Sequence, residues 1–147
     1  MKFAVPVWSS WNLTDMDLLE SVQRRAVKMV SGLRSKTYEG RLTELNLMSL
    51  EMRRQKFDLV QVFKIIHGYD KVDRETWFKL AGEAPARVTR GTSDPLNIVQ
   101  KMASTDPRKN FFSLRVAKTW NELSSELKRA PSVESFKRQI NDYLLKK

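Results

Sequence analysis

A long helical pattern between Ser49 and Gly68 constrains the fold of this chain more than any other stretch. Ser49 is a favourable N-cap residue, and Gly68 stands where a left-handed residue commonly ends a helix. Apolar residues recur between them at helical spacing on one face: Met52, Leu59, Val62, Phe63 and Ile66. Other apolar residues point elsewhere: Phe57, Val60 and Ile65. Because a helix that is apolar on several sides is usually surrounded by other helices, the pattern predicts a helical core around it.

Two further amphipathic patterns predict helices that could pack around this one. The first begins at Thr14, whose side chain can cap it, and ends at Gly32. Its apolar stripe consists of Leu19, Val22, Ala26, Met29, Val30 and Leu33. The second begins at Ser132 and is expected to bury Val133, Phe136, Ile140, Tyr143 and Leu144. Shorter helical patterns run over residues 38–45, after Asp73 and from Arg108.

Two stretches lie outside these helical patterns. Residues 1–12 are apolar around Pro6 and are expected to form an arm laid on the core. Residues 82–107 contain scattered glycine and proline, which predicts one long irregular connection, with a brief strand conceivable at 96–102. A connection this long in a compact domain is usually functional or mobile. We therefore predict a single all-α domain over residues 1–147, a compact bundle of about five helices around the central long helix.

The chain is strongly basic. Its 147 residues include 27 Lys and Arg against 17 Asp and Glu, which gives a formal net charge of +10. Such an excess attracts polyanions such as RNA, DNA or an anionic membrane surface, whereas the alternative is that it only keeps the surface soluble. No apolar run approaches the roughly 20 residues that span a bilayer, and no membrane partner is expected. The absence of cysteine excludes disulfides and thiolate metal ligands.

Side chains suited to catalysis or metal binding are sparse in this sequence. His67 is the only histidine, and at the end of the central helix it is more readily explained as a capping group than as a base. Asp15 and Asp17 are so close in sequence that they are best explained as charges at a helix N-terminus. The five glycines are scattered singly, so no phosphate-binding loop is present. We predict no enzymatic activity, no cofactor and no metal site.

A series of short motifs runs through nearly the whole chain. The first half contains Pro6-Val7-Trp8, Leu19-Glu20, Val22 to Ala26, Tyr38-Glu39, Leu50-Glu51, Arg53-Arg54, Phe63-Lys64-Ile65 and Gly68. The second half contains Thr89-Arg90-Gly91, Arg108, Phe111-Phe112, Arg115-Val116, Trp120-Asn121, Ala130-Pro131-Ser132 and Phe136-Lys137. In this order the motifs resemble the region after the polymerase core in reverse transcriptases of non-LTR retrotransposons, particularly chicken-repeat-1-like LINE elements. Ser124 departs from the pattern, because family members often have proline there.

The resemblance implies an isolated C-terminal, thumb-adjacent region that lacks the polymerase and endonuclease motifs. It implies a domain that binds the RNA of the element, an RNA–DNA hybrid or target DNA, with the polymerase domain as a further partner. The net charge agrees, because phosphate contacts supply affinity without a sequence code. The expected contact residues are Arg24, Arg25, Lys28, Arg53, Arg54, Lys64, Arg108, Lys109 and Arg115. Such a protein is expected inside the cell, in a nuclear or cytoplasmic ribonucleoprotein.

Two alternatives stand beside this interpretation. Each of these cations could instead lie on a solvated face or in an intramolecular ion pair, and Glu20 precedes Arg24 by the four residues that favour such a pair. The whole chain could instead be a protein-interaction or scaffold module, which docks the polymerase or has been domesticated for a host role. That function requires an exposed apolar patch, for which Trp8, Trp11 and Phe57 are candidates.

Overall fold

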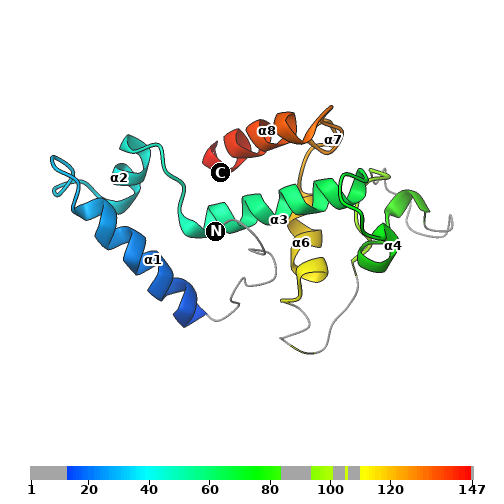
Figure 1. Cartoon of the computed structure of the whole chain (residues 1–147), viewed down its shortest axis with the longest axis horizontal. Coiled ribbons are helices and arrows are strands. Elements are labelled where there is room, and N and C mark those ends of the chain that lie inside the picture. The colour runs from blue at the N-terminus through cyan, green and yellow to red at the C-terminus, as the bar shows by residue number, and fades with distance from the viewer. Residues whose placement is uncertain (1–12, 84–93, 101–104, 106–109, 147) are drawn as a thin grey trace. The chain divides into compact units, whose positions relative to one another are not determined.

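The computed structural model describes residues 13–83, 94–100, 105 and 110–146, and within them the fold is all-α, as predicted (Figure 1). The helices are α1 (Leu13–Lys28), α2 (Tyr38–Glu44), α3 (Leu50–Ile66), α4 (Arg74–Trp77), α6 (Phe112–Asn121), α7 (Ser125–Lys128) and α8 (Val133–Lys146), with one 3-10 turn, η1 (Ala81–Glu83). These residues form no strand. In the segment 96–102, where the sequence allows a brief strand, Ile98 forms an isolated antiparallel bridge with Leu80.

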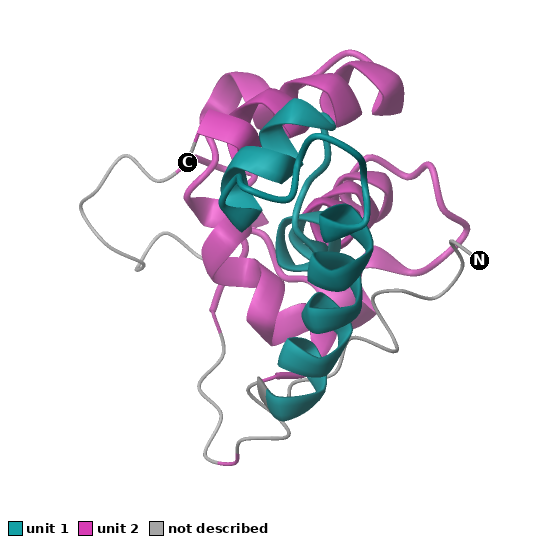
Figure 2. Cartoon of the chain, turned by 90° about the vertical axis from the view of Figure 1, so that its left-hand side faces the viewer, with its two compact units in different colours: residues 1–55 teal, residues 56–147 magenta. Residues whose placement is uncertain are grey.

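The chain divides into two compact units, residues 1–55 and residues 56–147 (Figure 2). The boundary falls within α3, so that helix begins in the first unit and continues in the second. The expected N-terminal arm, residues 1–12, and most of the expected long connection lie outside the described residues. That residues 1–147 act as one domain stays a prediction.

The first unit has a small interior in which polar contacts are prominent. Val27, Leu33 and Leu42 are its buried apolar residues. Arg41 is buried beside them, and its guanidinium donates to the backbone oxygens of Leu33, at 2.8 Å, and Arg34, at 2.9 Å. These bonds fix the turn that follows α1, because a buried guanidinium is costly unless its hydrogen bonds are satisfied.

The N-terminal helix differs from its predicted form. α1 ends at Lys28 rather than at Gly32, and the residues after it form turns in which Gly32 adopts a φ of +79°. Most of the predicted apolar stripe is exposed, including 66% of Val22 and 80% of Met29. The helix instead turns Val27 inward, together with the polar side chains of Glu20 and Gln23, which bond to α2 and to the start of α3.

Aromatic rings form the core of the second unit. The Phe63 ring on α3 stacks on the Phe136 ring on α8 with centroids 4.4 Å apart, and Trp120 on α6 lies 6.1 Å from Phe136. All three side chains are fully buried. The Trp120 indole N–H donates to the Leu96 carbonyl at 2.8 Å, which ties residues 94–98 to this core.

The predicted ends of the central helix are confirmed. The Ser49 hydroxyl accepts the Met52 N–H at 3.2 Å, and the backbone of Gly68 has a φ of +71°. The predicted core face of α8 is confirmed for Phe136, Ile140 and Leu144, which are buried in the second unit, whereas Val133 and Tyr143 are only half-buried. Local caps and one apolar stripe therefore determine where these two helices lie in the sequence.

A buried ion pair links α3 to α6. The Arg115 guanidinium donates twice to the Asp58 carboxylate, with both nitrogen–oxygen distances at 3.0 Å. Burial raises the pKa of the Asp58 carboxyl above its ordinary value, and the Arg115 charge opposes this shift. Burying the two charges thus costs desolvation free energy, and removing either partner would leave the other charge buried without compensation.

We predict that Arg115→Met destabilises the protein by about 2–4 kcal/mol, because it leaves the Asp58 carboxylate buried without its partner. The double variant Asp58→Leu/Arg115→Met should be close to neutral, within about 1 kcal/mol of wild type. Urea unfolding measures both, with Lys118→Met on the exposed face of α6 as the control. Additive losses in the double variant would contradict the pairing.

Candidate nucleic-acid interface

Three of the predicted contact residues form an exposed basic cluster on α1. Arg24, Arg25 and Lys28 lie on its last turns, where the helix dipole favours positive charge. The Arg24 guanidinium carbon lies 4.8 Å from the centre of the Tyr38 ring. Among the described residues, no carboxylate lies within ion-pair distance of these three side chains. We call them the α1 cluster.

The alternative expected for Arg24, an ion pair with Glu20, is not formed. Glu20 accepts a short hydrogen bond from the Tyr38 hydroxyl and another, at 3.0 Å, from the Leu50 N–H. Burial and the Glu20 hydrogen bond raise the pKa of Tyr38 to about 12. Glu20 therefore ties α1 to α2 and α3 and forms no ion pair with Arg24.

The paired arginines at the start of α3 occupy a different environment. Arg53 is half-buried and approaches the Met48 carbonyl at 3.5 Å, while Arg54 has a buried guanidinium nitrogen without a hydrogen-bond partner. Arg54 and Arg24 line a pocket of about 260 Å³ that also contains four carboxylates, those of Asp17, Glu20, Glu39 and Glu51. Because the acidic side chains outnumber the basic ones, this pocket disfavours a polyanion.

The other predicted contact residues are not brought together. Lys64 lies 4.0 Å from an Asp70 carboxylate oxygen, and Arg115 is held by Asp58, so the alternative of an intramolecular ion pair applies to both. Because two hydrogen bonds to Asp58 occupy the Arg115 guanidinium, we do not expect Arg115 to contact a phosphate. Arg108 and Lys109 lie outside the described residues.

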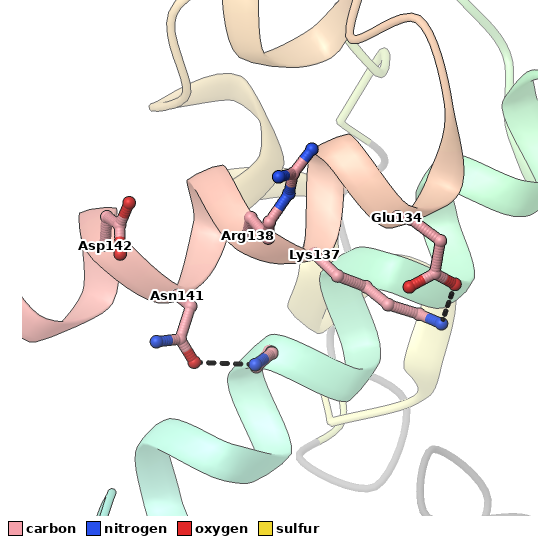
Figure 3. Close-up of a pocket in the computed structure, with 6 residues that line it drawn as sticks. Glu134, Lys137, Arg138, Asn141 and Asp142 are labelled. Carbon is pink, nitrogen blue, oxygen red and sulfur yellow. Dashed lines mark hydrogen bonds and ion pairs between the residues drawn. The ribbon is translucent and has the colours of Figure 1, made fainter. Parts of the chain in front are cut away.

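Sequence reasoning missed a second basic surface, a groove of about 320 Å³ between α3 and α8 (Figure 3). Its lining residues are Lys56, Glu134, Lys137, Arg138, Asn141 and Asp142. The Lys56 ammonium donates to the Asn141 side-chain oxygen at 2.6 Å, and the Lys137 ammonium lies 2.7 Å from a Glu134 oxygen. We call this the α3–α8 groove.

The α8 side of this groove could be predicted from the sequence, whereas the α3 side could not. On a helical wheel, the stripe of Phe136, Ile140 and Leu144 leaves Lys137 and Asn141 on one flank of α8. Nothing local indicates that Lys56 of α3 lies against that flank, since 85 positions separate Lys56 from Asn141.

A buried lysine forms another cluster in the second unit. Lys128 is 1% exposed, and its ammonium donates to the Asn97 side chain at 2.7 Å and to the Asn121 carbonyl at 3.3 Å. Burial lowers its pKa, and the nearby Asp94 carboxylate opposes the shift. The His67 ring hydrogen-bonds the Lys128 backbone oxygen at 2.8 Å. Because Lys128 is enclosed, this cluster anchors residues 94–98 rather than binding a ligand.

Within the described ranges, no group of three or more histidine, cysteine or carboxylate residues is placed to hold a metal ion. No helix of that part of the chain is long and apolar enough to cross a bilayer.

Comparison with known proteins finds no matching family model, no similar curated protein and no similar solved structure. The retrotransposon resemblance therefore stays a prediction that rests on the motifs themselves.

We predict that Glu20→Ala destabilises the protein by about 2 kcal/mol, because two hydrogen bonds to a charged acceptor are lost. The pKa of Tyr38 should fall from about 12 toward its ordinary value. Because that pKa is raised in the folded state, the bond stabilises the protein below pH 10, and this stability is lost as the pH rises through about 12.

Thermal unfolding and ultraviolet titration of tyrosine measure the two effects. Glu39→Ala, which removes an exposed carboxylate beside Tyr38, is the matched control and should change both quantities little. A Tyr38 titration that is unaltered in Glu20→Ala would show that Glu20 does not hold the phenol.

Proposed function

We propose that this chain is a nucleic-acid-binding helical region that contacts RNA or DNA phosphates through basic helix faces and has no catalytic activity of its own. The α1 cluster is the observation that carries the proposal. Its three cations are exposed and lack carboxylate partners among the described residues. Exposed cations of this kind bind phosphates and release counterions, which gives affinity without base recognition.

The distribution of charge supports the same function. Seven basic residues but one acidic residue lie outside the described ranges, so those segments carry six of the ten excess positive charges. Further phosphate contacts could thus come from Arg108 and Lys109. The motif order supports an origin in the post-polymerase region of a non-LTR retrotransposon reverse transcriptase, where RNA, an RNA–DNA hybrid or target DNA is the partner within a ribonucleoprotein.

We predict that Arg24→Gln/Arg25→Gln/Lys28→Gln weakens binding to a labelled single-stranded RNA by about tenfold or more at moderate salt. The dependence of log affinity on log salt should become shallower by roughly 2, because each phosphate contact to a single strand contributes about 0.7. Fluorescence anisotropy over a salt series measures both quantities, and duplex DNA and a hybrid tested in parallel define the preferred ligand.

The matched control is Lys71→Gln/Lys79→Gln/Lys118→Gln, which removes the same charge from three exposed sites of the second unit. If the two triple variants lose equal affinity, the effect is one of net charge and the α1 cluster is not a site. If wild-type protein binds none of the three ligands near physiological salt, the proposed function is wrong.

One observation favours a second candidate function, that of a protein-interaction module. Five large apolar side chains are exposed on α1 and in the turn after it: Leu18, Leu19, Val22, Met29 and Val30. An apolar face of this kind is typical of a surface that packs against another protein or domain. Of the residues expected to form such a patch, Phe57 is half-buried, and Trp8 and Trp11 lie outside the described residues.

A further inference from the structure

The α3–α8 groove brings cations from two helices to one place. Lys56 comes from α3, and Lys137 and Arg138 come from α8 (Figure 3). The Lys56 ammonium donates to an amide oxygen rather than to a carboxylate. Because an amide carries no net charge, the positive charge of Lys56 is not neutralised by this bond.

Three cations and two carboxylates, those of Glu134 and Asp142, line the groove, so positive charge is in excess there. Burial lowers the pKa of Lys56, the charge of Lys137 lowers it further, and Asp142 opposes both effects. On the other side, the pKa of the Glu134 carboxyl is lowered by the hydrogen bond from Lys137, by the charge of Lys137, and by the charges of Arg138 and Lys64. Positive potential from both helices therefore converges where Glu134 lies.

We propose that the α3–α8 groove binds a backbone phosphate of a nucleic acid, with the ammonium groups of Lys56 and Lys137 as its donors. The inference rests on the proposed function and adds to it a second contact site, away from the α1 cluster in the sequence. Glu134 acts as an internal competitor, because its carboxylate occupies Lys137 until a phosphate oxygen replaces it. Arg138 and Lys64 add to the attraction without direct contact.

This arrangement predicts changes of opposite sign in two variants. Lys56→Gln/Lys137→Gln should weaken RNA binding by about fivefold or more and reduce the salt slope by roughly 1, as the loss of phosphate contacts requires. Glu134→Gln should tighten binding by about two- to fivefold, because it removes the competing negative charge from the groove. A purely structural role for these residues would not produce the gain.

The experiment is anisotropy of the full chain with a labelled single-stranded RNA, with two matched controls. Lys71→Gln/Lys79→Gln removes two exposed lysines elsewhere in the same unit, and Glu126→Gln removes one exposed carboxylate on α7. Lys56 is half-buried and bonded to Asn141, so its loss could weaken folding. Lys137→Gln alone and Glu134→Gln, whose side chains are 40% and 78% exposed, keep the proposal testable, with circular dichroism as the check on folding.

The results separate this inference from the proposed function. If wild-type protein fails to bind RNA, both are wrong. If the α1 cluster variant loses affinity while the groove variants behave like their controls, the groove proposal alone is overturned. If the groove variants change binding to phosphatidylserine vesicles but not to RNA, the groove recognises a membrane surface and the proposal is again overturned. Loss in the lysine variants together with gain in Glu134→Gln supports it.

Discussion

The stacking of Phe63 on Phe136 is the contact on which the second unit depends. It joins α3 to α8, and the neighbouring Trp120 brings α6 into the same core (Figure 1). Large aromatic rings contribute much of the buried area of a small core and tolerate few relative orientations. Once Phe136 points inward, the spacing of α8 places Lys137 and Asn141 on the flank that meets Lys56. The basic groove is thus a consequence of core packing.

Intramolecular ion pairs with carboxylates limit which of the many cations can contact a ligand. Asp58 occupies Arg115 in the second unit, and Asp70 lies near Lys64. In the first unit, Glu20 bonds to Tyr38 and to the Leu50 N–H instead of to Arg24. The fold therefore uses some charges internally and leaves others exposed, so net charge alone does not locate an interface.

Local features of the structure could be predicted from the sequence, whereas most long-range pairings could not. The ends of α3 follow from Ser49 and Gly68, and the buried face of α8 follows from one apolar stripe. The predicted end of α1, at Gly32, is wrong. The apolar spacing continues through Met29 and Val30, although these residues lie in turns after the helix has ended at Lys28. A periodic pattern does not by itself show where a helix gives way to a turn.

The candidate site shows the same division. The α1 cluster lies on consecutive turns of one helix, so its three residues could be named from the sequence. Arg115 could not be assigned to Asp58, which lies 57 positions away, and no local signal connects Lys56 with α8. Such pairings depend on how helices pack, which the sequence encodes only through the whole core.

The central claim is that cations of α1 and of the α3–α8 groove bind phosphates, with a phosphate replacing Glu134 as the partner of Lys137. Nuclear magnetic resonance of lysine and arginine side chains during titration with a short RNA tests it most directly. We expect the signals of Arg24, Arg25, Lys28, Lys56 and Lys137 to shift in a salt-dependent way, and that of Arg115 to stay in place. Shifts confined to the basic residues between positions 84 and 109, or no shifts at all, would contradict the account.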